Sequence, residues 1–179
     1  SYYGDNLLTV VAEQNGWHDY SRESFIKTFF CNKRIGRIEP AKEWSHSKNN
    51  HTNPMYRKQY MQSFDYEVIQ GDGQVTGRLI GGHGDLLEIG KDAAIKLVEK
   101  DFEGAILFFE DIEEVCTLEY IEDFFDKLGR SGILKRLNGI IIGRMKIGET
   151  GKVLADCIKK VVAEKYSVPT IPIIYGLNI

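Results

Sequence analysis

The chain has 179 residues, of which 42% are hydrophobic and 27% are charged, and its formal net charge is -3. This length is enough to bury a hydrophobic core in one or two domains. The small negative charge gives no electrostatic basis for binding nucleic acid or an acidic membrane surface. No apolar run approaches the roughly 20 residues that a bilayer-spanning helix needs. We therefore expect an ordinary soluble protein, with no nucleic acid and no membrane as partners.

The first 40 residues predict two short helices and a strand. Apolar residues recur at helical spacing over 6–14 and 21–30, and polar and apolar residues alternate over 34–40. We expect the apolar face of the second helix to pack in a core. That face consists of Phe25, Ile26, Phe29 and Phe30.

Residues 41–64 show no periodicity and are rich in Ser, Asn, His, Lys and Gln. In a compact domain, a stretch of this length is typical of a functional loop or a linker. It carries the aromatic residues Trp44, Tyr56 and Tyr60, which favour the functional loop.

A β-hairpin is predicted next. Residues 66–70 and 74–80 resemble strands, and Gly71-Asp72-Gly73 resembles a tight turn between them. The turn sequence Gly81-Gly82-His83-Gly84 follows directly. Because glycine has no Cβ, such residues let the backbone approach another group closely.

From residue 105 onward, short apolar strands alternate with amphipathic helices. The strands are expected at 105–109, 140–142 and 168–175, and the helices at 118–128 and 153–165. This alternation predicts an α/β fold whose parallel strands are joined by crossover helices.

The strand at 105–109 leads directly into Glu110 and Asp111. Open α/β folds place their chemistry at the carboxyl ends of the strands. Two interpretations of Glu110 remain open from the residues alone: a carboxylate positioned for chemistry, or a carboxylate that caps the next segment. For Asp111 the capping interpretation is favoured.

The cysteines and histidines predict no metal site. Cys31, Cys116 and Cys157 are far apart and odd in number, which favours free thiols in a reducing, cytoplasmic compartment. His46 and His51 lack both the spacing and the accompanying ligands of a zinc site.

Six pieces of sequence, taken in order, resemble the LD-carboxypeptidases and their relatives, the microcin C self-immunity peptidases. The resemblance rests on the order of the pieces and covers nearly the whole chain. The pieces are Tyr3-Gly4 before a helix, the loop from Pro40 to Glu43-Trp44, Gly77-Arg78-Leu79-Ile80-Gly81-Gly82, Leu107-Phe108-Phe109-Glu110-Asp111, Asn138-Gly139-Ile140-Ile141-Ile142-Gly143 and Val168-Pro169.

The resemblance implies a swivelling β/β/α domain over 71–179 that lacks its final segment. Residues 1–70 would be the tail and substrate loop of an N-terminal α/β domain. Members of the family are serine peptidases with a Ser-Glu-His triad, and Glu110 matches the glutamate. The serine would precede Ser1 and the histidine would follow Ile179, so the chain alone is expected to be inactive.

The resemblance also suggests residues that contact the substrate. Trp44 matches a loop tryptophan that stacks on the aromatic part of the substrate, although a tryptophan that anchors the loop is an alternative. His83 stands where relatives usually have Asn, and would otherwise be a solvated histidine. Arg144 or Lys146 could bind a substrate carboxylate, or could be a solvated loop charge.

The implied activity is hydrolysis of an amide next to a free carboxylate, in a murein tetrapeptide or a peptidyl-nucleotide. No metal and no cofactor are expected, and the family resemblance implies a homodimer. The alternative is a non-catalytic α/β module that binds a peptide or a protein. In that module Glu110 would be structural, and 41–64 would be an interaction loop.

Overall fold

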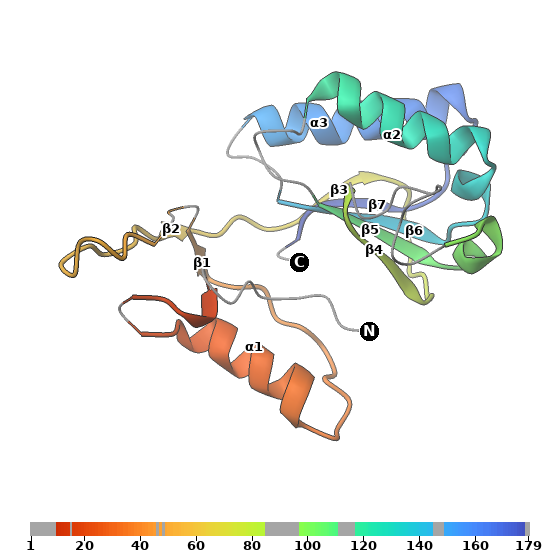
Figure 1. Ribbon diagram of the computed structural model, residues 1–179. Coiled ribbons are helices and arrows are strands. Elements are labelled where there is room, and N and C mark those ends of the chain that lie inside the picture. The colour runs from red at the N-terminus through yellow and green to blue at the C-terminus, as the bar shows by residue number, and fades with distance from the viewer. Residues whose placement is uncertain are drawn as a thin grey trace. The chain divides into compact units, whose positions relative to one another are not determined.

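The chain divides into two compact units, Ser1–Phe64 and Asp65–Ile179. The boundary lies after residue 64 rather than after residue 70, because strand β3 (Glu67–Gln70) belongs to the sheet of the second unit. The computed structural model describes residues 10–14, 16–45, 47, 49–84, 97–110, 117–144 and 149–177 (Figure 1).

The second unit is built on a five-stranded sheet with the spatial order β3-β7-β6-β5-β4. The pairs β4–β5, β5–β6 and β6–β7 are parallel, and β3 pairs antiparallel with β7. The α/β class predicted from the alternating elements is therefore confirmed. The parallel strands are β4 (Leu79–His83), β5 (Ile106–Glu110), β6 (Gly139–Gly143) and β7 (Ile173–Leu177).

The predicted hairpin between 66–70 and 74–80 is wrong. A strand does form at the first segment, but it pairs with β7, and β4 lies at the opposite edge of the sheet. Gly71 follows β3 with a φ of +68°, and a Cβ there would lie 2.8 Å from the Thr170 carbonyl oxygen. The glycine turn lets the chain pass close to the segment that leads into β7, so the strand does not fold back on its neighbour in sequence.

The helices α2 (Leu118–Arg130) and α3 (Glu149–Lys160) lie on the same face of this sheet (Figure 1). They connect β5 to β6 and β6 to β7, so the predicted crossover helices are confirmed. A π-helix, η5 (Val161–Lys165), continues α3. Two short 3₁₀ helices, η3 (Glu99–Phe102) and η4 (Ile133–Lys135), precede β5 and β6.

The core lies between the helices and the sheet. Leu107 and Phe109 of β5 are fully buried, and the Phe109 ring packs on Phe124 and Phe125 of α2 at centroid distances of 4.9 and 5.4 Å. Burying a ring of this size contributes about 1.5–3 kcal/mol. Because side chains alternate along a strand, Glu110 points to the face of the sheet opposite the helices.

A buried carboxylate joins α2 to the end of α3. Asp126 is only 5% exposed, and it accepts hydrogen bonds from Arg130, Lys165 and the Tyr166 hydroxyl. The bonds from Lys165 and Tyr166 lower the pKa of Asp126 to about 2. Gly129 leaves room for this arrangement, because a Cβ there would lie 2.3 Å from the Tyr166 ring.

The first unit contains helix α1 (Asp19–Phe30) and a short antiparallel pair, β1 (Glu43–Trp44) and β2 (Met61–Gln62). The segment 41–64, expected to be a structureless loop, therefore holds a small β-pair. Residues 34–40 form no strand, and each of them is exposed. The alternation does not make a strand there, and among the described residues no segment pairs with 34–40.

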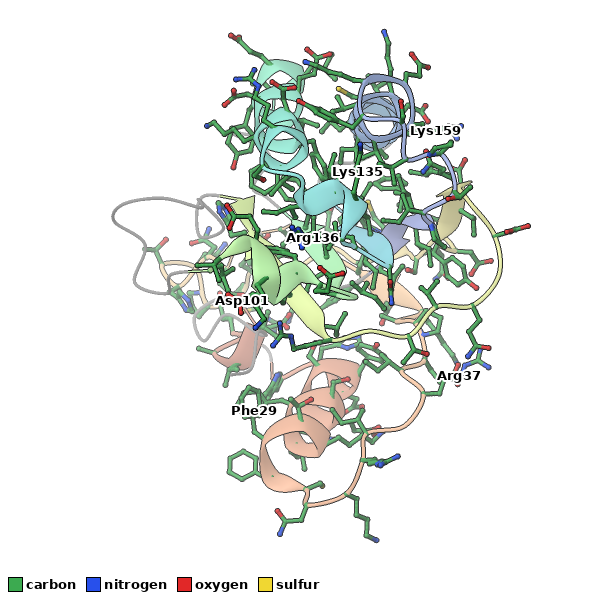
Figure 2. All side chains as sticks on the ribbon, turned by 90° about the vertical axis from the view of Figure 1, so that its right-hand side faces the viewer. Phe29, Arg37, Asp101, Lys135, Arg136 and Lys159 are labelled. Atoms are coloured by element: carbon green, nitrogen blue, oxygen red, sulfur yellow. The ribbon has the colours of Figure 1, made fainter. Side chains whose placement is uncertain are left out.

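The expected core face of α1 is also wrong, because no residue of α1 is buried. Phe29, labelled in Figure 2, is 43% exposed and Phe30 is 74% exposed. The aromatic rings pack mainly on one another: Phe25 lies 4.6 Å from Phe29 and 5.2 Å from Trp17, measured between ring centroids. The predicted helix is confirmed, but its aromatic residues form a cluster instead of a buried face.

Several expectations lie outside the described residues. Asp111, Cys116, His46 and Lys146 are among them, as is most of the helix expected over 6–14. Among the helices that the structure describes, none is both long and apolar enough to cross a membrane.

Candidate active site

The carboxyl ends of the parallel strands meet at one edge of the sheet. Glu110 ends β5, and His83, at the end of β4, is its register partner. On the other side of β5, Phe109 is level with Ile142 of β6. Arg144 follows β6 directly. Three of the four site residues predicted from the sequence, His83, Glu110 and Arg144, are therefore brought to this edge.

His83 and Glu110 project from the sheet side by side. Neighbouring strands lie about 4.8 Å apart, and register partners in a parallel pair point to the same face. That face is opposite the one on which Phe109 packs against α2. Both residues are half-buried. The sequence predicted each of them separately, with His83 in a turn, and the structure places His83 within β4 beside the acid.

Gly81 permits this close pairing. A Cβ on Gly81 would lie 1.8 Å from the carbonyl oxygen of Phe108, its register partner on β5. Any side chain would push β4 away from β5 two residues before the His83 and Glu110 pair. The close backbone approach predicted from the glycine turn is confirmed at this position.

Arg144 is held against the end of β7. Its backbone N–H donates to the Leu177 carbonyl at 3.2 Å, and its Nη2 donates to the Gly176 carbonyl at 3.3 Å. Burial lowers the pKa of Arg144 from its ordinary value, but an arginine guanidinium stays protonated in proteins. Arg144 is therefore a half-buried cation fixed at the strand ends, and the alternative of a solvated loop charge is wrong.

Tyr175 is a residue of β7, and burial raises the pKa of its hydroxyl group. Tyr175 is only 4% exposed. The Arg144 charge acts in the opposite direction on this phenol and favours its ionised form. A buried phenol and a fixed guanidinium thus share the end of β7. Nothing in the sequence pattern marked Tyr175 beyond its place in an apolar strand.

Trp44 belongs to the first unit. It lies in β1, is half-buried, and pairs with Met61 of β2. The sequence did not predict the long-range hydrogen bonds that the residues next to Trp44 and Met61 make. His18 and Glu43 are in hydrogen-bond contact, and Tyr60 donates to Glu13 across 47 positions of sequence. Since these partners lie far apart in the chain, no local motif marks them.

The strand ends offer a carboxylate, an imidazole and a guanidinium. A rigid carboxylate can orient an imidazole and stabilise its protonated form. A guanidinium can bind a carboxylate through two parallel hydrogen bonds. Within the parts of the chain that the structure describes, no group of three or more His, Cys, Asp or Glu side chains is arranged to hold a metal ion.

A family model described as the LD-carboxypeptidase C-terminal domain matches residues 76–179. This match covers more than half of the chain and includes all the parallel strands. The chain therefore belongs to the LD-carboxypeptidase family, as the resemblance of its sequence pieces predicted.

A curated relative supports the same assignment. A Vibrio cholerae protein named as a carboxypeptidase is 25% identical over 186 residues, which cover 99% of this chain and 51% of the relative. The chain therefore spans about half the length of the curated relative that it matches.

Solved structures share the fold. An MccF-like protein from Streptococcus pneumoniae, solved with AMP, has a TM-score of 0.77 at 22% identity, and the match covers 99% of this chain and 55% of that chain. An MccF-like protein from Bacillus anthracis has a TM-score of 0.70 at 23% identity, with coverages of 90% and 47%. The microcin C7 self-immunity protein MccF in complex with glutamyl sulfamoyl guanosine has a TM-score of 0.66 at 21% identity, with coverages of 90% and 47%.

Proposed function

We propose that this chain is the C-terminal part of a serine carboxypeptidase and supplies the glutamate of its Ser-Glu-His triad. The observation that carries the proposal is the place of Glu110, which ends a central strand in a domain of the LD-carboxypeptidase family. The reaction would be hydrolysis of an amide bond next to a free carboxylate.

Glu110 suits the role of a triad acid. Such an acid holds the histidine in the correct tautomer and stabilises the imidazolium that forms when the serine loses its proton. It must stay ionised and be held rigidly. Strand β5 is paired on both sides, with β4 and with β6, which limits movement of the carboxylate. The serine and the histidine are expected outside this chain, so the chain alone is expected to be inactive.

Arg144 and His83 are proposed to bind the substrate. A fixed guanidinium at the strand ends could hold the free carboxylate that defines a carboxypeptidase substrate. His83, beside Glu110, could donate a hydrogen bond to the same end of the substrate. Both groups are already held at the edge of the sheet, which lowers the entropy lost on binding.

Trp44 is proposed to stack on an aromatic part of the substrate. Structural neighbours of this chain were solved with AMP, glutamyl sulfamoyl guanosine and aspartyl sulfamoyl adenosine. These ligands support a peptidyl-nucleotide as one substrate class. A murein tetrapeptide is the other, because the family model carries the LD-carboxypeptidase description.

The decisive experiment is Glu110→Gln in the protein encoded by the complete gene, assayed on a murein tetrapeptide and on an aminoacyl-nucleotide analogue. We expect kcat to fall by about a thousandfold or more, as removal of a triad acid does. Glu103→Gln is the matched control, because Glu103 is an exposed acid that pairs with Arg136 in the same unit. A loss of less than about tenfold would exclude the triad role.

The encoding gene provides a second check. A Gly-x-Ser-Asp-type turn before Ser1 and a histidine soon after Ile179 would support the peptidase, and the absence of either would contradict it. A protein that binds both substrates and hydrolyses neither would instead support the non-catalytic binding module. The cytoplasmic location and the homodimer remain proposals, and sedimentation of the full-length protein tests the dimer.

A further inference from the structure

We propose that a polar network in the first unit positions Trp44 and thereby sets the affinity for the aromatic part of the substrate. The network consists of Glu13, His18, Glu43, Lys58 and Tyr60. This inference rests on the proposed function, because it assigns positioning residues to the tryptophan that would stack on the substrate. Its evidence is a set of hydrogen bonds, an ion pair and a ring stack among these five residues.

The first half of the network surrounds a buried acid. The Glu13 side chain is only 6% exposed, and its Oε2 lies 3.8 Å from Nζ of Lys58, whose side chain is 9% exposed. The Tyr60 hydroxyl donates to Oε1 of Glu13 at 2.6 Å. Burial, followed by this hydrogen bond, raises the pKa of Tyr60, so the phenol remains a donor. A buried carboxylate is stable only when it is paired in this way.

In the second half of the network, His18 contacts one residue from each of the two segments that form the β-pair. Nε2 of His18 lies 3.0 Å from Oε1 of Glu43 on β1. The imidazole also stacks on the Tyr60 ring, with centroids 5.1 Å apart and an interplanar angle of 29°. Tyr60 comes directly before β2. His18 therefore bridges the two segments that carry the strands, and Tyr60 connects this bridge to Glu13.

The register of the pair decides which face the network contacts. Glu43 is opposite Gln62, and Trp44 is opposite Met61. Because side chains alternate along a strand, Glu43 and Trp44 point to opposite faces. Tyr60 lies two positions before Gln62, so it shares the face of Glu43. The network holds one face of the β-pair, and Trp44 is presented on the other.

The β-pair needs this support. Each strand has only two residues, and an isolated two-stranded pair is marginally stable in water. The network adds an ion pair, two hydrogen bonds and a ring stack on one face. A tryptophan on such a fixed strand loses little freedom when it stacks on a ligand. Without the network, ordering of the strand would weaken binding.

Tyr60→Phe tests the inference in the full-length protein, because it removes the hydroxyl bond to Glu13 and keeps the ring that stacks on His18. We expect the dissociation constant for AMP, used as the probe, to rise about fivefold, the size of one net hydrogen bond. KM for the aminoacyl-nucleotide analogue should rise equally with kcat unchanged. KM for the murein tetrapeptide, which has no aromatic ring, should stay the same.

Tyr20→Phe is the matched control. The Tyr20 hydroxyl donates to the Glu39 carbonyl at 2.7 Å in the same unit, outside the network. It should leave all three constants unchanged. Equal effects of Tyr60→Phe and Tyr20→Phe would overturn the inference, and so would equal KM increases for both substrates.

Fluorine NMR of protein labelled with 5-fluorotryptophan gives an independent measurement without substrate. Trp17 and Trp44 each contribute one resonance, which Trp17→Phe and Trp44→Phe assign, and Tyr60→Phe should shift or broaden only that of Trp44. An unchanged Trp44 resonance would overturn the positioning role. If the unaltered protein neither binds AMP nor hydrolyses either substrate, the proposed function fails, and the NMR result still decides whether the network positions Trp44.

Discussion

His83 at the end of β4 and Glu110 at the end of β5 are register partners in a parallel sheet. The two residues are 27 positions apart in the sequence. The pairing puts an imidazole beside the acid that we propose for the triad. It also gives His83 a defined place, which its apparent position in a glycine-rich turn did not suggest.

Replacing His83 should affect substrate binding more than the chemical step. We expect His83→Ala to raise KM about tenfold, because loss of a hydrogen bond to a charged group costs about 1.5 kcal/mol or more. His83→Asn should retain most of the affinity, since an amide can also donate. His51→Asn, at an exposed histidine of the first unit, is the control. Steady-state kinetics on both substrates decide the outcome, and an unchanged KM in His83→Ala would refute the assignment.

Substitution of Arg144 by lysine should show whether Arg144 makes a bidentate contact with the substrate or supplies only a positive charge. Arg144→Lys keeps the charge but loses the planar fork, and we expect KM to rise about tenfold for substrates with a free carboxylate. A substrate whose carboxylate is amidated should show little difference between Arg144→Lys and the unaltered protein. Equal losses on both substrates would indicate that Arg144 only supports the end of β7.

Gly81→Ala should destabilise the second unit by about 3 kcal/mol, because overpacking of this kind forces the backbone to shift. The new Cβ would meet the Phe108 carbonyl oxygen at 1.8 Å. Gly132→Ala is a useful comparison, since Gly132 has a φ of +77° but nothing within 4 Å of its Cβ position. Its cost should be about 1 kcal/mol. Urea unfolding measures both, and similar losses would contradict the close approach of β4 to β5.

Because of Asp126, the free energy of unfolding of the second unit should vary with pH in the acid range. Its pKa is lowered from 3.8 to about 2 in the folded state, first by the hydrogen bond from Lys165. A carboxyl group whose pKa is lowered by folding stabilises the folded state at pH values above its pKa in the unfolded chain. This stabilisation disappears as the pH falls through its pKa in the folded state.

The variant Asp126→Asn should therefore be less stable than the unaltered protein above pH 3.8, and the difference should shrink as the pH falls toward 2. Urea unfolding across this range measures the difference. Asp123→Asn is the control, because Asp123 pairs with Lys127 on the exposed side of α2, and exposed pairs contribute about 0–1 kcal/mol. A difference that is constant with pH would contradict the prediction.

Part of the fold could be predicted from local pattern. Three local patterns identified β5, α2 and β6: the apolar run at 105–109, the spacing of Ile121, Phe124, Phe125 and Leu128, and the isoleucines at 140–142. They did so because buried residues recur at a regular spacing along a helix or strand, and that spacing is visible in the sequence. The end of β5 at Glu110 followed from the same run. The family resemblance came from the order of such pieces.

Other features depended on partners that lie far away in the sequence. The pattern at 66–70 predicts a strand, but the partner of this strand, β7, lies about a hundred positions later, as the pairing of Gln70 with Ile173 shows. The apolar residues of α1 had helical spacing, yet spacing cannot say whether another layer covers the helix.

The sequence by itself determined the α/β class, the family and the acid at the end of β5, because these depend on residue type and on short-range periodicity. Only the tertiary structure decided that His83 stands beside Glu110, that Arg144 is fixed on the end of β7, and that Glu13 accepts a hydrogen bond from Tyr60. Register, burial and hydrogen bonding between distant segments arise when the chain packs, and no local pattern encodes them.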